Sequence, residues 1–338
     1  RHRRGRIRGS PAVGGLSWST DVSVARPHRA TAFAPASVGN VAVGFDILGF
    51  SVDALGDTVT VTRSLSPGVR ILSARGVAGD LPTEPALNTA GRALLAMQEA
   101  MHLPFGFDVE IEKGIPLGSG LGGSAASAVG AVVAANAVLD QPCGKIELLK
   151  FAMQGEAVAS GSLHVDNISP SLFGGLVLTV GIDDPRVKQI PVPENVRAVI
   201  VHPRMFLSTK EARSILSARV NMSDFVWQTA NLAGFIAGCY TDDLDLIRAS
   251  LEDVVIEPQR QSMIPGFAEV RAAAMQAGAL GCSISGAGPT MFAWAIEAQT
   301  SIVRDAMCAA FEAVGIDVDQ WIIDLRSEGA RVVSELTR

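Results

Sequence analysis

An uncharged segment in the first half of the chain restricts the fold more than any other feature. Residues 114–139 contain no Asp, Glu, Lys or Arg, and a glycine- and serine-rich stretch, IPLGSGLGGSAAS, is followed there by a run of alanine and valine. A helix of this composition must be buried nearly all round, and its small side chains allow close packing on a sheet. The N–H groups at the helix start still need partners, and a glycine-rich loop that leads into them suits a phosphate.

Two general phosphate-binding patterns fit this loop poorly. The P-loop pattern GxxxxGK[ST] fails because Ser124 follows Gly118 and Gly123 without the required lysine. The dinucleotide-binding pattern GxGxxG matches at Gly118, Gly120 and Gly123, but the preceding segment, KGIP, does not end a strand. The first acid downstream, Asp140, follows a helix, whereas a ribose-binding acid should end a second strand. We interpret this match as accidental, and a glycine-rich hairpin that covers a core helix is the alternative without a ligand.

The composition is that of a globular protein without a nucleic-acid or membrane partner. The 338 residues allow two domains, the formal net charge is -6, and only 18% of residues are charged. No apolar run reaches the roughly 18 residues of a membrane span without a polar, Gly or Pro interruption. Four cysteines lie far apart, with no CxxC motif, which argues against a zinc site and a disulfide framework. We therefore expect a soluble enzyme or binding protein in a reducing cytoplasm.

The first 26 residues differ from the rest of the chain. Five arginines lie among the first eight residues, and no acid precedes Asp21. We interpret residues 1–26 as a basic extension, expected to be disordered and to lie outside the fold. A misassigned start or an expression remnant explains it, whereas a genuine transit peptide would place the protein in a plastid instead of the cytoplasm.

Sequence periodicity predicts an α+β chain. Alternating patterns predict strands at residues 58–62, 107–112, 174–180 and 196–201. Helical periodicity predicts helices at residues 88–101, 124–139, 145–159, 225–241, 244–250, 267–277 and 300–314. Because strands and helices do not alternate regularly, we expect mostly antiparallel sheets. The Pro- and Asp-rich segment 181–195 marks a boundary, which predicts domains at residues 27–185 and 186–338.

The glycine loop resembles that of the galactokinase, homoserine kinase, mevalonate kinase and phosphomevalonate kinase superfamily. The family pattern PxxxGLGSSAA reads PLGSGLGGSAAS here, with Gly123 in place of one serine of the usual pair and Ser124 retained. The resemblance covers nearly all of the chain after residue 30. Four further stretches are similar to the homoserine kinase branch: FAPASVGNVAVGFDILG (33–49), HVDNISPSLFGG (164–175), STKEAR (208–213) and EPQRQSMIPGF (257–267). Five motifs in order make the resemblance specific.

The resemblance implies a two-domain small-molecule kinase fold. It predicts an N-terminal ribosomal-protein-S5-like domain that binds ATP, a C-terminal ferredoxin-like α+β domain, and an active site in the cleft between them. The implied reaction is the ATP- and Mg²⁺-dependent phosphorylation of L-homoserine to O-phospho-L-homoserine in threonine biosynthesis. The implied partners are L-homoserine and ATP, and a homodimer is compatible with the sequence.

The same resemblance assigns the nucleotide and metal side of the site. The ATP-binding loop comprises Pro116, Leu117, Gly118, Ser119, Gly120, Leu121, Gly122, Gly123, Ser124 and Ala125. Ser124 and Glu156 match the Mg²⁺ ligands and are assigned to catalysis, with an exposed helix carboxylate as the alternative for Glu156. Lys113 is also assigned to catalysis because it could neutralise phosphate charge, with a solvated strand-end lysine as the alternative. Asn88 is expected at the adenine pocket or as a helix N-cap.

The acceptor side follows from the amino-acid substrate that the resemblance implies. Arg213 and Arg260 suit a planar carboxylate through paired donors. Asn40 and Asp46 match the residues that hold the amino group and the hydroxyl end. Thr209 is either a pocket hydroxyl or a helix N-cap.

The identity of the general base stays open. Asn167 stands where other superfamily members carry an aspartate, so it is expected to close the acceptor pocket as a catalytic residue. We therefore expect the proton to leave late, to the phosphate itself, with Asp166 as the alternative base. His164 is interpreted as satisfying a turn. The loop SISGAGPTMFAW at residues 283–294 is expected to pack beside the phosphate loop and help to close the cleft.

Other functions are weighed against this one. A mevalonate or shikimate kinase would share the phosphate loop, and a hydroxy acid would also suit two arginines. A non-catalytic ligand-binding relative would lack turnover despite binding ATP. The hypothesis of a nicotinamide-dependent oxidoreductase is supported by the GxGxxG match alone.

Overall fold

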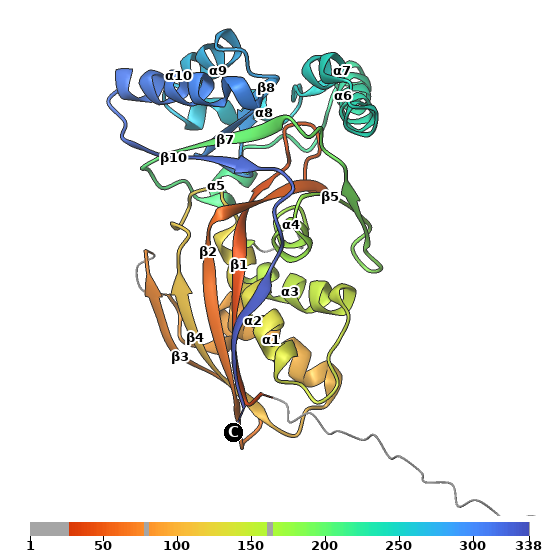
Figure 1. Ribbon diagram of the computed structural model, residues 1–338, viewed down its shortest axis with the longest axis vertical. Coiled ribbons are helices and arrows are strands. Elements are labelled where there is room, and N and C mark those ends of the chain that lie inside the picture. Colours follow the sequence, from red (N-terminus) through yellow and green to blue (C-terminus); the bar gives the residue numbers. More distant parts are fainter. Residues whose placement is uncertain (1–26, 78–80, 161–164, 338) are drawn as a thin grey trace, which may run out of the picture.

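Two sheets, each covered by helices, make up the computed structural model (Figure 1). It describes residues 27–77, 81–160 and 165–337. The predicted basic extension at 1–26 and His164 lie outside these residues. Within them, no helix combines the length and the hydropathy of a membrane span.

Among the described residues, the first sheet has seven strands, and all of its pairings but one are antiparallel. Along its main path lie β11 (Arg331–Leu336), β1 (Arg29–Gly39), β2 (Leu48–Ser64), β4 (Gly106–Lys113) and β3 (Val69–Gly76). The strands β5 (Leu176–Val180) and β6 (Arg186–Ile190) extend it through the pairing of β5 with β2. The parallel pair is β3 with β4.

Helices α1 (Thr89–Met101), α2 (Gly123–Ala137), α3 (Lys145–Ser160) and α4 (Ile168–Phe173) cover one face of this sheet (Figure 1). A short 3₁₀ helix, η1 (Pro85–Leu87), precedes α1. The helix α2 packs against β1 and β2 and against α1 and α3. From Ala125 to Ala135 every residue except Val133 is buried, which confirms the prediction that the uncharged helix is enclosed on all sides.

The second sheet is antiparallel throughout and has the strand order of a ferredoxin-like fold. Its order is β10 (Val318–Asp324), β7 (Val196–Pro203), β9 (Met291–Ile296) and β8 (Gly281–Ile284), so that in chain order the strands stand fourth, first, third and second. Its helices are α5 (Thr209–Ser214), α6 (Met222–Thr241), α7 (Leu244–Ser250), α8 (Glu257–Arg260), α9 (Phe267–Gln276) and α10 (Thr300–Ala313), with 3₁₀ turns η2 (Gln261–Met263) and η3 (Glu297–Gln299).

Strand β9 joins two hydrophobic cores because both of its faces are buried. Met291 and Ala293 belong to the core under α9 and α10. Phe292 and Trp294 point the other way, and their rings lie 5.6 and 6.2 Å from the ring of Phe50 in β2. Aromatic contacts of this kind add to the area buried and hold the two sheets together.

The predicted α+β class with mostly antiparallel sheets is confirmed. Each predicted helix and strand overlaps one that the structure contains, while β1, β3, β6, β8, β10, β11, α4, α5 and α8 were not predicted. The division into residues 27–185 and 186–338 stays a prediction. Strand pairing divides the chain differently. Both β6 and β11 lie in the predicted second domain, but they belong to the first sheet, where β6 pairs with β5 and β11 pairs with β1. Hydrogen bonding between strands distant in sequence leaves no mark on local composition.

Candidate active site

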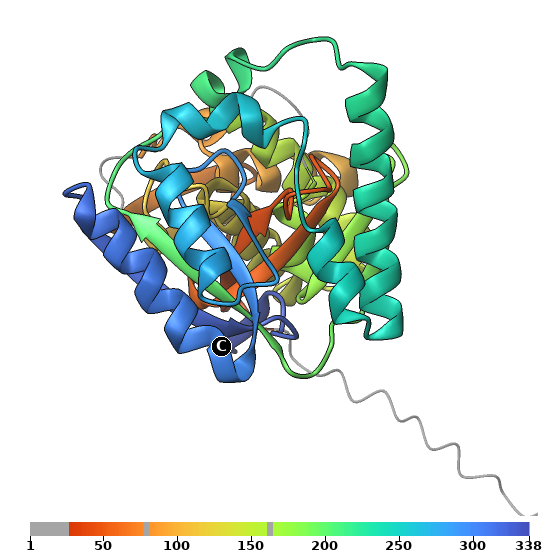
Figure 2. The same cartoon turned by 90° about the horizontal axis from the view of Figure 1, so that it is seen from above.

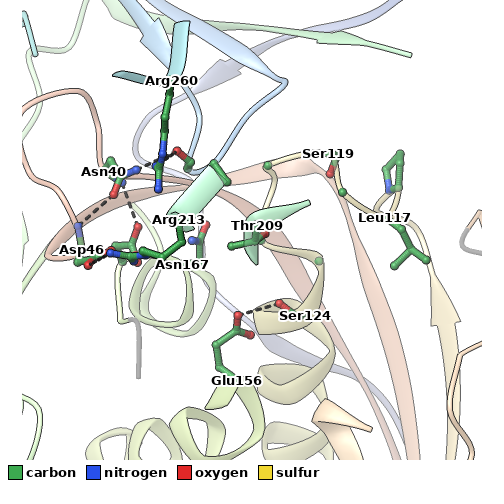
Figure 3. Close-up of a pocket in the computed structure, with 18 residues that line it drawn as sticks. Asn40, Asp46, Leu117, Ser119, Ser124, Glu156, Asn167, Thr209, Arg213 and Arg260 are labelled. Carbon is green, nitrogen blue, oxygen red and sulfur yellow. Dashed lines mark hydrogen bonds and ion pairs between the residues drawn. The ribbon is translucent and has the colours of Figure 1, made fainter. Parts of the chain in front are cut away.

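One cavity lies where the two sheets' loops meet, and it gathers most of the predicted site residues (Figure 3). Its volume of about 160 Å³ is several times the roughly 30 Å³ share of one water molecule. It is lined by Asn40, Asp46, Pro116, Leu117, Gly118, Ser119, Gly120, Gly122, Gly123, Ser124, Glu156, Asp166, Asn167, Thr209, Arg213, Arg260, Gly286 and Ala287. Charged groups gather at the end near Asn40 and Arg260, and the glycine loop runs to the other end at Leu117 (Figure 3).

The glycine loop directs a helix N-terminus into this cavity. Gly118, Gly120 and Gly122 all have left-handed backbone, with φ of 61°, 76° and 68°. Gly122 is the N-cap of α2 and supplies no side-chain hydrogen bond to the first turn. Backbone N–H groups and the positive end of the helix dipole at such a terminus favour an anion.

Beneath the loop lies a buried network that sequence reasoning missed. The Lys113 ammonium forms an ion pair with Asp57 and donates to the Gly123 carbonyl at 2.6 Å and to Ser127 Oγ at 2.9 Å. Asp57 also accepts from the Gly114 N–H at 3.1 Å and from the Ser127 hydroxyl at 2.7 Å. The network therefore ties the strand before the loop to the first turn of α2.

Lys113 accordingly occupies a different place from the one predicted. It is 3% exposed and does not line the cavity in the described part of the chain. The alternative of a solvated strand-end lysine is wrong, because the side chain is buried and positions the loop. The neutralisation of phosphate charge by Lys113 stays a prediction. The sequence does contain a signal for the partner of Lys113. Asp57 is a charged residue that stands directly before the alternating strand TVTVT.

Removal of one partner of this pair is expected to destabilise the fold. Asp57→Asn leaves the Lys113 ammonium buried without its carboxylate, which should lower the free energy of unfolding by about 3–5 kcal/mol. The double variant with Lys113→Gln should lose less than the sum of the single variants. Denaturant unfolding measures these values, and Asp108→Asn, which breaks the exposed Arg70–Asp108 pair, is the control with a much smaller loss. Additive losses in the double variant would contradict the network.

Ser124 and Glu156 form a hard-oxygen pair at the start of α2. The Ser124 hydroxyl donates to Glu156 Oε1 at 2.9 Å, and Glu156 is 9% exposed, on the neighbouring helix α3 (Figure 3). A hydroxyl and a carboxylate that face a phosphate site fit Mg²⁺, which takes few protein oxygens together with phosphate oxygens and water. The exposed-carboxylate alternative for Glu156 does not hold, because the side chain is buried against the cavity.

The acceptor end is built on an arginine–aspartate pair. Arg213 in α5 donates to both carboxylate oxygens of Asp46, at 2.9 and 2.8 Å. The Arg213 and Arg260 guanidinium carbons lie 4.8 and 5.4 Å from the centre of the Phe45 ring. The ring thus holds two cations close to each other and to the cavity.

Arg260 is more deeply enclosed than Arg213. It is 3% exposed and donates to the carbonyls of Ala212 and Gly286 at 3.0 and 3.1 Å. Burial, and then the nearby Arg213, lower the pKa of Arg260 to about 10, so its charge persists at neutral pH. Two of its five donors already hold the backbone, which leaves the others for a ligand.

Asn40 fastens the turn that carries Asp46. Its side chain donates to the Gly286 carbonyl at 3.0 Å and accepts from the Asp46 N–H at 3.0 Å. Asn40, Val41, Ala42 and Asp46 all have positive φ, a conformation that costs non-glycine residues energy and that clusters at functional sites. The predicted contact of Asn40 with a substrate amino group therefore competes with a structural role that the sequence could not reveal.

Asn167 and Asp166 lie at the same end of the cavity as Asn40 (Figure 3). Asn167 precedes α4 and accepts from the Ser37 hydroxyl at 3.0 Å, while Asp166 is 3% exposed and accepts from the Asn40 N–H at 3.1 Å. Both line the cavity, so the choice of proton acceptor between the phosphate itself and Asp166 stays open. Thr209 lines it too, and the N-cap of α5 is Ser208, whose side chain accepts from the Glu211 N–H.

Three predicted ATP-site residues lie outside the cavity wall in the described part of the chain. Leu121 and Ala125 are fully buried, and neither lines the cavity. Asn88 is the N-cap of α1, accepts from the Gly91 N–H at 3.2 Å and donates to the Pro82 carbonyl at 2.9 Å. Its contacts match the N-cap alternative, because both ends of the amide are used by the backbone.

The predicted glycine-rich loop at residues 283–294 does pack against the phosphate loop. The Ser285 hydroxyl donates to the Gly120 carbonyl at 2.7 Å, and the Thr290 hydroxyl donates to the Ser119 carbonyl at 2.6 Å. A Cβ atom at Gly120 would lie 2.6 Å from the carbonyl oxygens of Ser285 and Gly288. Gly120 is therefore required for the contact between the two loops as well as for its backbone angle.

Alanine at Gly120 should weaken the expected binding of ATP more than alanine at Gly118. Both positions carry the left-handed strain of about 1–2 kcal/mol, but the Cβ at Gly118 meets the ring of Phe206, which is 67% exposed and can rotate away. Gly120→Ala must instead move backbone. We expect the affinity for ATP, measured by titration calorimetry, to fall at least tenfold more for Gly120→Ala, and equal effects would contradict the loop contact.

Comparison with known proteins places this cavity in a family. The model of the GHMP kinases N terminal domain matches residues 88–175, and that of the GHMP kinases C terminal matches residues 235–313. The homoserine kinase of Xylella fastidiosa (strain M12) is 51% identical over 311 residues, which cover 90% of this chain and 94% of that protein. The homoserine kinase of Chlorobium phaeovibrioides is 43% identical over 89% of this chain and 98% of its own length.

Solved structures share the fold. The crystal structure of homoserine kinase from Cytophaga hutchinsonii matches with a TM-score of 0.86 and 42% identity, covering 90% of this chain and 98% of that one. The mevalonate kinase of L. major, with a TM-score of 0.60 and 14% identity over 89% of this chain and 99% of that one, shares the fold alone. The N-terminal family model covers the phosphate loop and the Ser124–Glu156 pair, and the C-terminal family model covers Arg260.

Proposed function

This chain belongs to the GHMP kinases and, within them, to the homoserine kinases, and on that premise we propose that its cavity transfers the γ-phosphoryl group of ATP to the hydroxyl of L-homoserine. The product is O-phospho-L-homoserine, the form of the amino acid used in threonine biosynthesis. The alternative of a nicotinamide-dependent oxidoreductase is dropped, because the glycine loop belongs to a kinase.

The observation that carries the choice of acceptor is the charge pattern at the end of the cavity near Asn40 and Arg260. Arg213 and Arg260 offer two guanidinium groups, and Asp46 offers a carboxylate that already pairs with Arg213. A zwitterionic amino acid can exchange with this internal pair, its carboxylate taking the arginines and its ammonium taking Asp46, so that no charge stays unpaired. A hydroxy acid has no ammonium group, so it would supply no cation to pair with Asp46.

Phosphoryl transfer needs the two substrates in line more than it needs covalent help from the protein. The α2 N-terminus and the glycine loop would hold the ATP phosphates, and Asn167 would orient the acceptor hydroxyl beside them. Mg²⁺, when bound, would neutralise phosphate charge, with Ser124 and Glu156 as its protein ligands. The hydroxyl proton would pass to the transferred phosphate or to Asp166.

An acceptor panel tests this function. A coupled assay of ADP release should give kcat/KM for L-homoserine at least 100-fold above that for mevalonate, shikimate or 3-amino-1-propanol, which lacks the carboxylate. Phosphorus NMR should identify the phosphate ester. Turnover with mevalonate or shikimate in preference would assign the chain to another small-molecule kinase, and ATP binding without any turnover would support a non-catalytic relative.

Two further parts of the proposal concern the setting of the enzyme. We propose a cytoplasmic location, which the four free thiols of the described structure support. A homodimer is proposed as the working form.

A further inference from the structure

Two positive groups that repel each other lie at the acceptor end of the cavity. Arg213 and Arg260 both line it, and they come from α5 and α8, two short helices close to each other on one side of the molecule (Figure 2). Burial first, and then the charge of Arg213, lower the pKa of Arg260. A long arginine side chain on so short a helix keeps much of its rotamer freedom unless another group holds its end.

The aromatic ring of Phe45 contacts both of these cations. The guanidinium carbons of Arg213 and Arg260 lie over the ring, 4.8 and 5.4 Å from its centre, and both distances are within the roughly 6 Å of a cation–π contact. The face of an aromatic ring is negative, so it attracts both cations and offsets part of their mutual repulsion. Phe45 is half-buried, and the attraction strengthens where water is excluded.

Phe45 and its neighbour Asp46 contact Arg213 from two directions. Asp46 accepts from both terminal nitrogens of the guanidinium group, at 2.9 and 2.8 Å, whereas the central carbon of that group lies over the Phe45 ring. The turn that presents them is itself held, because the Asp46 N–H donates to the Asn40 side chain at 3.0 Å. The backbone therefore presents a carboxylate and a ring face to the same cation.

An uncharged ring suits this position better than a second carboxylate would. A carboxylate would neutralise one arginine and would repel the carboxylate of the acceptor at the short distances of a binding site. The ring attracts cations without a net charge of its own, so Arg213 and Arg260 keep their full charges for an anionic ligand. Asp46 already supplies the carboxylate that is expected to take the ammonium group of the acceptor.

We propose that Phe45 is a positioning residue of the acceptor site, whose ring keeps Arg213 and Arg260 in place while the acceptor carboxylate displaces Asp46 from Arg213. This inference rests on the function proposed above, in which the amino acid exchanges with the Arg213–Asp46 pair. In that exchange Arg213 gives up its hydrogen bonds to Asp46, whereas the contact with the ring uses no donor and persists. Phe45 does not line the cavity in the part of the chain that the structure describes, so it acts through the two arginines.

Removal of the ring tests this role. Phe45→Leu keeps an apolar side chain without a ring face, so the KM for L-homoserine should rise about tenfold, while kcat and the KM for ATP stay unchanged. Phe45→Tyr keeps the ring face and should leave the KM for L-homoserine near that of the wild type. The matched control is Phe33→Leu, because Phe33 forms the same kind of contact with Arg331, at 4.9 Å, away from the cavity. It should leave both KM values unchanged.

A graded change in the ring separates its charge distribution from its packing. Site-specific replacement of Phe45 by mono-, di- and trifluorophenylalanine withdraws electron density from the ring face step by step while the size of the ring changes little. The logarithm of the dissociation constant for L-homoserine, measured by titration calorimetry, should rise with the number of fluorine atoms. Binding of 3-amino-1-propanol, which has no carboxylate for the arginines, should not follow this series.

The outcomes distinguish this inference from the proposed function. A wild type that does not bind L-homoserine overturns both. A wild type that binds it, together with a flat fluorine series, overturns the role of Phe45 alone and assigns the ring to packing. An equally tight Phe45→Leu variant would do the same. Circular dichroism checks the fold of each variant, and if Phe45→Leu does not fold, the fluorine series decides by itself because it keeps the ring.

Discussion

Glu156→Gln is expected to lower kcat for phosphoryl transfer by about 100- to 1,000-fold, the loss typical of removing one electrostatic contact to a developing charge. The amide keeps the size of the side chain and can still accept from the Ser124 hydroxyl, which lies 2.9 Å from Glu156 Oε1. It removes the negative charge that would balance Mg²⁺. The concentration of Mg²⁺ needed for half-maximal rate should therefore rise, as measured in the coupled assay.

The control for this variant lies on the same helix. Glu147 is in the first turn of α3 and exposed, so Glu147→Gln changes the charge of α3 equally but away from the cavity. Its kcat and Mg²⁺ requirement should equal those of the wild type. If Glu156→Gln turns over at a near-normal rate at low Mg²⁺, the carboxylate is no metal ligand, and the Ser124–Glu156 pair is structural.

Arg213→Lys is expected to raise the KM for L-homoserine about ten- to more than a hundredfold while the KM for ATP hardly changes. Lysine keeps the positive charge but loses the planar pair of donors that now holds Asp46 at 2.9 and 2.8 Å. Each lost charge-assisted hydrogen bond is worth about 1.5–3 kcal/mol, and about 1.4 kcal/mol changes an affinity tenfold.

Arg204→Lys is the matched control, because Arg204 also binds an aspartate, Asp319, through two donors at the surface and away from the cavity. It should leave both KM values unchanged. An acceptor without a carboxylate should bind wild type and Arg213→Lys equally poorly. The interpretation fails if Arg213→Lys raises both KM values together and lowers the melting temperature, as a purely structural ion pair would.

Arg260→Lys is a less selective test, for a reason that only the structure supplies. The Arg260 side chain donates to the Ala212 and Gly286 carbonyls, so its loss also loosens α5 and the loop that contacts Gly120. The prediction from sequence gave Arg213 and Arg260 the same role, as partners of the acceptor carboxylate. Their different burial makes Arg213 the better residue for isolating the acceptor carboxylate.

The sequence by itself determined the elements whose signal is local. A run of 26 uncharged residues, 114–139, was enough to predict the enclosed α2 and an anion site at its start. Alternation and helical periodicity located the strands and helices with long, regular patterns. The five motifs located Ser124, Arg213, Arg260 and other residues that the fold gathers in one cavity. Each of these signals lies within a short stretch of chain.

Tertiary structure decided what depends on contacts across the chain. Asp57 and Lys113 are 56 residues apart, and Asp46 and Arg213 are 167 apart, yet each pair meets in one ion pair. Neither pairing changes the composition around its members, so periodicity could not reveal that Lys113 supports the loop from beneath. The return of β11 to the first sheet likewise depends on hydrogen bonds to β1, at the other end of the chain. Local patterns report which face of an element is buried, whereas only the packed structure reports which partner buries it.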